Sequence, residues 1–468
     1  MDSTDIVVVG AGPAGLSAAA AAAGLGLSVT LIDEQPALGG QVWRGLERRG
    51  PITADDRAGL ALMAGARGAG VVLHRGATVF DVAFDGDAPA VAWLAADAVG
   101  RVAARALILA TGAMERPLPF PGWTLPGVLG VGALQAALKT GGLVPNDGLV
   151  LAGQGPLLLL YLEQLLVAGG RVAAILDTTP PGRSLTEAAR LLPAALAADP
   201  AIVARGTLLM ARRLASGIPL HRGVLRMSAE GTDRVTSVRF ADAGGEHVLP
   251  CAVLAVHDGV IPNTQVTRML RLDHEWRDAA RCFAPVTDAH GRSSRAGVWV
   301  AGDGAGIEGA AAAVAAGRLA ALDAARAIGR LDAAGFRAGA AQPLKRRAAA
   351  RAVRRFLDAL DPPRDPVAWL ADDTVVCRCE EITAGEIRAA IAGGAAGPNR
   401  VKTATRCGMG ACQGRMCGPV LTQLVARATG RAESLVGALR IRPPLKPVPM
   451  AALAALAASN DARDPEER

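Results

Sequence analysis

Five cysteines lie close together near the C-terminus of the 468-residue chain, and their spacing suits metal chemistry. A single residue separates Cys377 from Cys379, and Cys407, Cys412 and Cys417 follow within one short glycine-rich stretch. Thiolates grouped in this way usually hold a metal, and four of them can bind a 2Fe–2S cluster. A structural zinc site remains the alternative, because four cysteines also suit tetrahedral zinc.

A second set of residues, at the other end of the chain, is typical of a dinucleotide site. The apolar run 6–9 predicts a buried parallel strand and leads into the turn Gly10-Ala-Gly-Pro-Ala-Gly15, after which an alanine-rich helix begins. Such glycines permit a tight turn, backbone approach to a pyrophosphate and close helix–strand packing. A further strand, 29–32, ends at Asp33, whose carboxylate can accept hydrogen bonds from a ribose, with Glu34 as the next candidate.

Three further segments favour FAD over NAD at this site. Gly39-Gly-Gln41 matches the segment that approaches the flavin in flavoproteins with two dinucleotide folds, and 107–112 matches their Ala-Thr-Gly strand end. The run 298–303 resembles their late motif, in which the aspartate meets the ribityl and pyrophosphate part of FAD. All three occur in the expected order, so we predict FAD. The predicted contacts are Gly10, Gly12, Pro13, Ala14, Gly15, Asp33, Glu34, Gln35, Gly40, Gln41, Val79, Ala110, Thr111, Gly112, Gly302 and Asp303.

A repeat of the strand–turn–helix pattern at 149–158, with Gly153 and Gly155 in its turn, predicts a second dinucleotide fold. Another strand of this repeat ends at Asp177. Leu158 replaces the third glycine, and its bulk opposes close packing of helix on strand. Binding of NAD(H) and a retained fold without a nucleotide both remain open. If a nicotinamide nucleotide binds, Asp177 favours NAD over NADP, because a carboxylate repels a 2′-phosphate.

Composition excludes several classes of function. The net charge of +7 is spread along the chain, without the aromatic and basic pattern of a nucleic-acid site. No apolar run reads as a bilayer span, so at most peripheral membrane contact is expected. The first residues lead directly into a strand, so we expect no signal peptide and a cytoplasmic protein with reduced thiols. Cys251 and Cys282 stand alone, and without a Cys-x-x-Cys pair a dithiol mechanism of the thioredoxin-reductase type is excluded.

Two local patterns precede and open the cysteine-rich region. The basic run 345–355 falls on a predicted helix, which is either a solvated linker or a docking face for an acidic partner. Thr383-Ala-Gly-Glu386 predicts a capping box at the start of another helix.

With these motifs in place, the chain resembles a known family along nearly its whole length. It is similar to the FAD- and cluster-containing subunit of opine oxidases, hydrogen cyanide synthase and bacterial hydroxyproline dehydrogenases. The segments 33–41, 257–264 and 405–417 carry the resemblance most specifically. It implies a β subunit similar to D-amino-acid oxidase or sarcosine oxidase, which oxidises the substrate C–N bond, and a small ferredoxin-like subunit that completes a hetero-oligomer. No cluster of histidine, tyrosine or arginine indicates an amino-acid pocket, so no catalytic residue is predicted on this chain.

The resemblance also implies which thiols hold the cluster. In modules of the bacterioferritin-associated ferredoxin (BFD) type, the second cysteine pair has a separation similar to that of Cys412 and Cys417. The implied ligands are Cys377, Cys379, Cys412 and Cys417, with Cys407 as a nearby spare thiol.

The predicted architecture is an α/β flavoprotein, in which an FAD domain contains an inserted second Rossmann-like domain and a small α-helical BFD-like 2Fe–2S domain follows. The predicted boundaries are 1–115 and 255–330 for the FAD domain, 116–254 for the inserted domain, 331–370 for a helical linker, 371–432 for the cluster domain and 433–468 for a C-terminal tail.

The predicted function is that of an electron-transferring subunit in an amino- or imino-acid dehydrogenase of the opine, glycine or hydroxyproline type. Electrons from the partner flavoprotein would pass through the cluster and FAD to an acceptor, in an order that the sequence leaves open. The main alternative is a stand-alone NADH-dependent flavin and iron–sulfur reductase. A scaffold subunit, whose cofactors only stabilise an assembly, is the second alternative.

Overall fold

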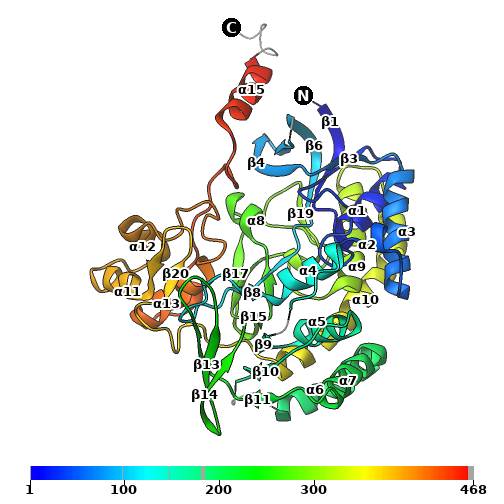
Figure 1. Ribbon diagram of the computed structural model, residues 1–468. Coiled ribbons are helices and arrows are strands. Elements are labelled where there is room, and N and C mark those ends of the chain that lie inside the picture. The colour runs from blue at the N-terminus through cyan, green and yellow to red at the C-terminus, as the bar shows by residue number, and fades with distance from the viewer. Residues whose placement is uncertain (1, 97, 147, 181–184, 462–468) are drawn as a thin grey trace.

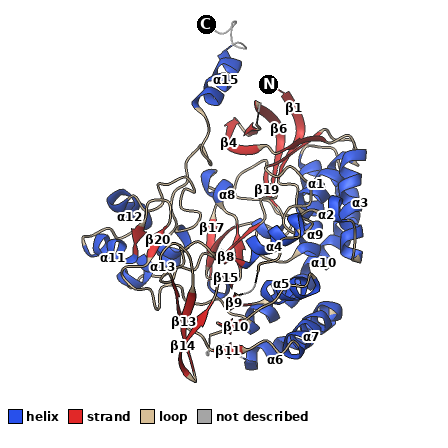
Figure 2. Ribbon diagram, viewed as in Figure 1, coloured by secondary structure: helices blue, strands red, loops and turns tan. Residues whose placement is uncertain are grey.

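The computed structural model describes residues 2–96, 98–146, 148–180 and 185–461 of the chain. Two α/β folds lie against each other, and a smaller, mainly helical module packs beside them (Figure 1). Figure 2 shows that the helices flank the strands in both α/β folds. This arrangement confirms the predicted fold class.

The first fold is built on a seven-stranded sheet with strand order β3-β2-β1-β6-β5-β4, in which β19 also pairs with β6. The parallel strands at its centre are apolar on both faces, as expected for a sheet that is covered on both sides. Helices α1 and α9 pack together on one face through small alanine side chains. The strands are β1 (Asp2–Val9), β2 (Val29–Asp33), β3 (Val72–Arg75), β4 (Thr78–Asp85), β5 (Ala88–Leu94), β6 (Val99–Leu109) and β19 (Val298–Val300), and the helices are α1 (Pro13–Ala23), α2 (Leu46–Arg49), α3 (Ala54–Gly68) and α9 (Ala310–Ala327).

The second fold is a five-stranded parallel sheet with strand order β11-β10-β9-β15-β8, beside a three-stranded antiparallel sheet. Its strands are β8 (Val128–Gly130), β9 (Leu149–Gln154), β10 (Ala174–Asp177), β11 (Leu220–Arg222) and β15 (Val253–Asp258), with β12 (Arg226–Glu230), β13 (Ser237–Asp242) and β14 (Gly245–Pro250) in the smaller sheet. Its helices are α4 (Val131–Gly141), α5 (Pro156–Val167), α6 (Leu185–Ala198) and α7 (Pro200–Ala215).

The boundary predicted between residues 254 and 255 falls inside strand β15. This strand pairs with β9 along its whole length, from Val253 opposite Leu149 to Asp258 opposite Gln154, so it belongs to the second sheet. The chain then returns to the first fold through a short pairing of β16 with β7. The connecting elements are β7 (Ala113–Glu115), β16 (Val260–Pro262), α8 (Gln265–Met269), β17 (His274–Arg277), η1 (Asp278–Ala280), β18 (Cys282–Pro285) and η2 (Gly302–Gly304).

The predicted linker contains one long helix, α10 (Ala333–Leu360), which packs against α9 and α6. Lys345, Arg346, Arg351 and Arg355 of its basic run are exposed, as a solvated or docking face requires, whereas another part of the run points inward. Arg347 is buried, and its Nε lies 2.9 Å from a carboxylate oxygen of Glu308, which also accepts from Arg351 at 2.6 Å. These two arginines therefore hold α10 against the loop before α9.

The cluster module spans residues 375–436 and has its own apolar core, which includes three of the five clustered cysteines. The capping box predicted at its first helix is present, because Thr383 and Glu386 bond reciprocally to each other's backbone N–H. The module comprises β20 (Val375–Cys377), β21 (Ile382–Thr383), α11 (Ala384–Ala392), α12 (Pro398–Thr405), α13 (Gly418–Thr429) and α14 (Glu433–Val436).

The segment predicted as a C-terminal tail folds back onto the protein. Leu439 lies in the core of the cluster module, while Leu445 packs in the core of the first fold and donates its N–H to the Phe80 carbonyl. Helix α15 (Met450–Asp461) then packs against the first sheet, where Leu456 is buried with Phe80 and Ala92. Residues 439–449, called the C-terminal segment below, therefore join the module to the first sheet.

Candidate functional site

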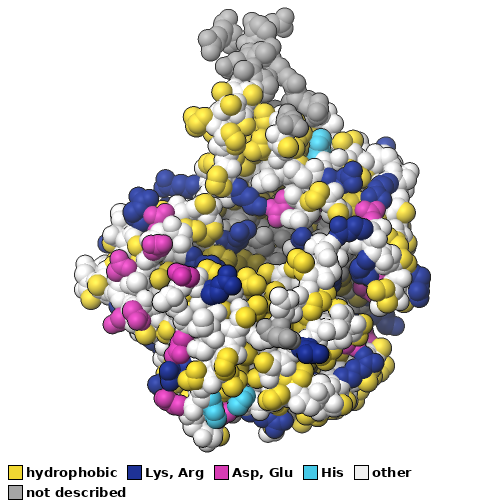
Figure 3. Space-filling model, in the orientation of Figure 1, with side chains coloured by type: hydrophobic (Ala, Val, Ile, Leu, Met, Phe, Trp, Pro, Cys, Tyr) yellow, Lys and Arg dark blue, Asp and Glu magenta, His cyan; other side chains and the backbone are white. Residues whose placement is uncertain are grey.

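One cavity of about 2040 Å³ runs along the carboxyl ends of strands in both sheets and reaches the cluster module. All residues predicted to contact FAD line it, except Gly15 and Gly302. Gln154 of the second fold also lines it, as do Cys379 and Cys412 of the module. The surface is visibly hollowed between the module and the two folds (Figure 3). The FAD contacts, the second fold and two of the clustered thiols therefore share one space.

The turn between β1 and α1 can hold a phosphate group, and each of its three glycines is needed for a different reason. At Gly10, where φ is +104°, a Cβ would lie 2.4 Å from the carbonyl oxygen of Ala110. A Cβ on Gly15 would lie 1.7 Å from the carbonyl oxygen of Gly10, so Gly15 lets α1 approach β1. Gly12 has open space on its cavity side, with only the Cα of Gly40 nearby at 3.9 Å. This opening and the N-terminus of α1 fit the pyrophosphate of FAD.

Two aspartates, Asp33 (buried) and Asp303 (half-buried), frame the cradle. Asp33, at the end of β2, accepts hydrogen bonds from the backbone N–H groups of Ala11 and Gln35, and burial raises the pKa of its carboxyl. Asp303 accepts from the N–H groups of Glu308 and Gly309, each at 3.0 Å, and burial likewise raises its pKa. Both carboxylates are held rigidly by the backbone, so each can present fixed acceptors to a ribose or ribityl hydroxyl.

The C-terminal segment supplies one contact to the predicted cofactor residues. Lys446 forms an ion pair with Glu34, and both residues line the cavity. Lys446 falls in the predicted tail, and no motif in the sequence indicated this contact. The segment therefore covers the edge of the FAD site next to Asp33.

The thiols of the module divide into a buried group and a pair that faces the cavity. Cys377, Cys407 and Cys417 are buried, and their Sγ atoms all lie within 4.8 Å of one another. Hydrogen bonds from the other two thiols lower the pKa of Cys377 below its usual value. Cys379 is exposed and Cys412 half-buried, and they are hydrogen-bond partners. Sulfur donors brought together in this way fit a 2Fe–2S cluster.

The choice of four ligands among the five thiols stays a prediction. Cys377 and Cys417, both in the predicted set, lie in the buried group, whereas Cys379 and Cys412 form the second pair. Cys407, predicted as a spare thiol, lies in the buried group with the first two. The cysteine spacing alone did not indicate that Cys407 lies with Cys377 and Cys417, because residues 407 to 417 form an irregular loop rather than a helix or strand.

A short chain of hydrogen bonds connects the FAD cradle with the cluster loop. The Thr111 hydroxyl donates to the carbonyl of Asn263, whose own N–H donates to the carbonyl of Gly112 at 2.9 Å. Two residues further on, the Gln265 side-chain amide donates to the carbonyl oxygen of Cys412, also at 2.9 Å. Gln265 therefore bridges the two predicted cofactor sites, and no motif indicated it.

The second fold keeps its glycine turn, which lines the same cavity through Gln154, Gly155 and Pro156. A Cβ on Gly153 would lie 2.0 Å from the carbonyl oxygen of His257, so this glycine is required for strand packing. The Gln154 amide donates to Asp258 at 3.1 Å and to the carbonyl of Pro362 at 2.8 Å. Asp177, predicted to select NAD, accepts from the N–H and hydroxyl of Thr179.

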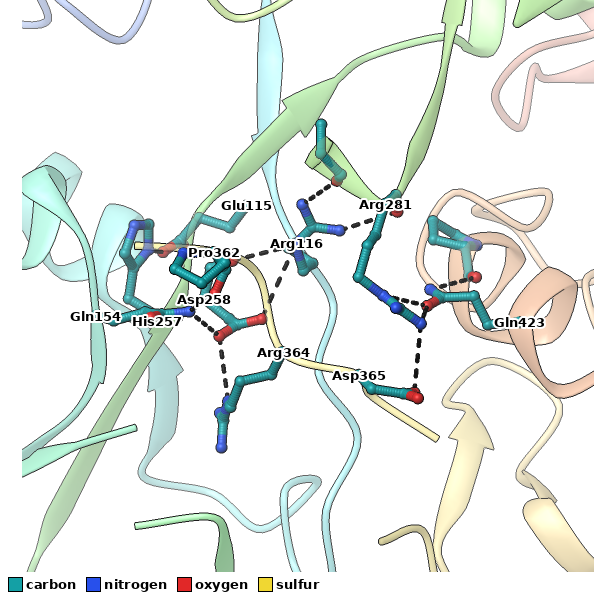
Figure 4. Close-up of polar contacts among 12 residues, drawn as sticks. Glu115, Arg116, Gln154, His257, Asp258, Arg281, Pro362, Arg364, Asp365 and Gln423 are labelled. Carbon is teal, nitrogen blue, oxygen red and sulfur yellow. Dashed lines mark hydrogen bonds and ion pairs between the residues drawn. The ribbon is translucent and has the colours of Figure 1, made fainter. Parts of the chain in front are cut away.

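A buried polar network fixes the module against the two folds (Figure 4). One carboxylate oxygen of Asp258 accepts from Gln154 and from Arg364, both at 3.1 Å. Arg116 is buried and donates to three backbone carbonyls, including that of Arg281. Arg281 in turn donates to the side chain of Gln423 in helix α13. No motif in the sequence indicated this network, because its members come from six separate segments.

A group of His221, Asp242 and His247 lies at the edge of the second fold, outside the cavity. The two rings lie 2.9 and 2.8 Å from the Asp242 carboxylate, and the N–H of Gly244 donates to it as well. These hydrogen bonds lower the pKa of Asp242 to about 2. The three side chains satisfy one another, which indicates a structural role.

The helices of the described residues include none with the length and apolar character needed to cross a bilayer. Two family models match the chain, namely the pyridine nucleotide-disulphide oxidoreductase family at residues 4–175 and the BFD-like [2Fe-2S] binding domain at residues 375–427. These matches cover the FAD cradle and the clustered cysteines, in agreement with the predicted cofactors FAD and a 2Fe–2S cluster.

Similar proteins match over nearly the full length. The chain is 42% identical to the A subunit of opine oxidase from Rhizobium meliloti (strain 1021), over 97% of this chain and 99% of that protein. It is 34% identical to the HcnB subunit of hydrogen cyanide synthase from Pseudomonas aeruginosa, over 95% and 97% respectively. Among solved structures, L-proline dehydrogenase from P. horikoshii has the same fold, with a TM-score of 0.71 and 22% identity, over 96% of this chain and 79% of that one.

The fold, the FAD cradle and the clustered thiols agree with these full-length matches. The chain therefore belongs to the family that contains the opine oxidase A and hydrogen cyanide synthase HcnB subunits, and it is an oxidoreductase that combines an FAD-binding fold with a 2Fe–2S domain.

Proposed function

We propose that the chain is the electron-transferring subunit of a multi-subunit amino- or imino-acid dehydrogenase. The observation that carries the proposal is the shared cavity, which contacts both the FAD cradle and the thiols of Cys379 and Cys412. FAD takes up electrons in pairs, whereas an iron–sulfur cluster carries them singly, so their proximity suits a relay. Relatives whose names denote subunits of opine oxidase and hydrogen cyanide synthase support a role within a complex.

In this proposal, substrate chemistry belongs to a partner. A flavoprotein β subunit similar to D-amino-acid oxidase oxidises the C–N bond of an opine, glycine or hydroxyproline, and a small ferredoxin-like subunit completes the hetero-oligomer. The contribution of this chain is to hold its two redox sites at a fixed separation. The Gln265 bridge and the network around Asp258 serve that task, because they join the module to both folds.

An anaerobic titration with NADH tests the proposal against a stand-alone reductase. The flavin absorbance of the purified holoprotein is followed while NADH and then dithionite are added. We expect no bleaching by stoichiometric NADH and full bleaching by dithionite, because Leu158 replaces the third glycine of the second fold's turn and opposes close approach of helix to strand there. Rapid bleaching by NADH would instead make the NADH-dependent reductase the correct function.

Replacing Gln265 by leucine is expected to slow electron exchange between FAD and the cluster. Leucine keeps the size of the side chain but removes the hydrogen bond to the Cys412 carbonyl. The loss of such a supporting contact typically costs about tenfold or more in function. The rate is measured after flash reduction of the flavin, by following the absorbance of the cluster.

The matched control is Gln342→Leu, an exposed position on helix α10. Flavin and iron contents should match wild type in both variants. An unchanged exchange rate in Gln265→Leu would show that the bridge has no part in transfer.

A further inference from the structure

We propose that a basic groove on the outer side of the cluster loop docks an acidic, one-electron carrier protein. The inference rests on the proposed relay function and adds the place and the chemistry of its redox partner. The groove is a cavity of about 750 Å³ between helix α12 and the C-terminal segment. Its cationic lining consists of Lys402, Arg406, Arg440, Arg442 and Lys446, and none of its lining residues is acidic.

Three of these cations are available to a partner. Arg406 pairs with Glu380 at 2.8 Å and Lys446 pairs with Glu34. Within the described residues, the structure gives the side chains of Lys402, Arg440 and Arg442 no carboxylate partner, and the two arginines are exposed. Lys and Arg side chains gather above helix α12 in Figure 3. Unpaired cations around a concave surface attract an acidic protein over a distance of about 8 Å, the screening length in physiological salt.

Only a thin wall separates this groove from the thiols. The floor of the groove is the loop 408–413, and Ala411 lines both the groove and the FAD cavity. Gly410 packs directly on Cys379, since a Cβ there would lie 2.2 Å from the Cys379 Cβ and 3.2 Å from its Sγ. A protein seated in the groove would therefore approach the thiol pair across this loop.

The centre of the groove is apolar. Met409 is 42% exposed, and Pro444 and Pro447 line the groove beside it. An apolar centre within a charged rim is the usual anatomy of a protein interface, and interfaces between redox proteins are small and transient. The groove contains no aromatic side chain on which a base could stack, which favours a protein over a nucleic acid.

The transfer at this site moves one electron and no atom. The carrier is reduced by one electron as the chain is oxidised by one electron. A chain that holds two electrons is therefore fully reoxidised by two successive carrier molecules. No proton transfer or bond cleavage is required of the groove residues.

The test uses the full chain with both cofactors loaded and oxidised, mixed rapidly with reduced plant-type 2Fe–2S ferredoxin, an acidic probe whose low potential drives its electron onto the chain through the same contact. The second-order rate constant is measured over a range of ionic strength. The groove variant is Arg440→Glu with Arg442→Glu, and Arg440→Gln with Arg442→Gln is a milder second variant. The matched control is Arg57→Glu with Arg318→Glu, which changes the net charge equally at exposed positions on helices α3 and α9.

We expect the wild-type rate constant to fall as salt increases, and the groove variants to lose about tenfold or more at low salt together with most of that salt dependence. The control should stay close to wild type. A basic cytochrome c, used as a second probe, should not be slowed by the groove variants.

Equal rates in the groove and control variants would overturn the proposal. So would a groove that binds only a small anion, seen as stabilisation by sulfate in wild type with an unchanged ferredoxin rate in the variants. Exchange between FAD and the cluster is measured without ferredoxin in the same samples. Its absence would contradict the relay itself, whereas its presence with charge-insensitive ferredoxin rates would contradict the docking site alone.

Discussion

Replacing Cys412 by serine will stop electron transfer through the chain while the FAD stays bound. Cys412 belongs to the predicted ligand set and lines the cavity, whereas the FAD cradle lies on a separate fold. Removing a thiolate ligand should lower cluster content or exchange by about a hundredfold. Iron content, the electron paramagnetic resonance signal of the reduced cluster and the flavin-to-cluster exchange rate measure the effect.

The matched control for this change is Cys407→Ser. The predicted ligand set omits Cys407, so this variant should keep its cluster signal, even though its sulfur lies within 4.8 Å of those of Cys377 and Cys417. Loss of iron in Cys407→Ser with retention in Cys412→Ser would replace Cys412 by Cys407 in the set. Loss of complex assembly before loss of turnover in Cys412→Ser would favour the scaffold function.

Replacing Gly12 by alanine will weaken FAD binding without destabilising the apoprotein. A Cβ at this position meets nothing closer than the Cα of Gly40 at 3.9 Å, but it occupies the space that the pyrophosphate requires. Overpacking of this kind costs about 1–3 kcal/mol, which weakens FAD binding by about ten- to hundredfold. Flavin fluorescence titration gives the affinity, and urea unfolding gives the stability of the apoprotein.

Gly15→Ala is the informative comparison. Its Cβ would lie 1.7 Å from the carbonyl oxygen of Gly10, so both the affinity for FAD and the stability of the apoprotein should fall. Equal losses of apoprotein stability in the two variants would mean that Gly12 is a folding residue rather than a cofactor contact.

The parts of the molecule that the sequence predicted well are those in which one short segment contains the whole feature. The cradle needs only the residues from Gly10 to Asp33, and the capping box needs only Thr383 and Glu386. Each follows from local geometry, because the interacting groups are fixed by their spacing along one strand or helix. The same reasoning predicted the repeated strand–turn–helix unit of the second fold.

The parts of the molecule that the sequence did not predict depend on contacts between distant segments. Arg364 meets Asp258 across 106 positions, and Gln265 meets Cys412 across 147. Such polar pairs leave no periodicity in the sequence, since each member looks like an ordinary loop residue until the fold brings it to its partner. The domain boundary between residues 254 and 255 was misplaced for a related reason, because Val253–Asp258 could extend either sheet until its pairing with β9 was known.

The C-terminal segment means that the cluster module is attached to the first fold at both of its ends. One attachment enters through α10, and the other leaves through Leu439 and is secured at Leu445 and Lys446. A module connected at one end only can rotate about that connection, whereas one attached at both ends is held in a fixed position. Turnover in this protein should therefore proceed without a large movement of the module. The overall rate of electron transfer would then be set by association with each redox partner.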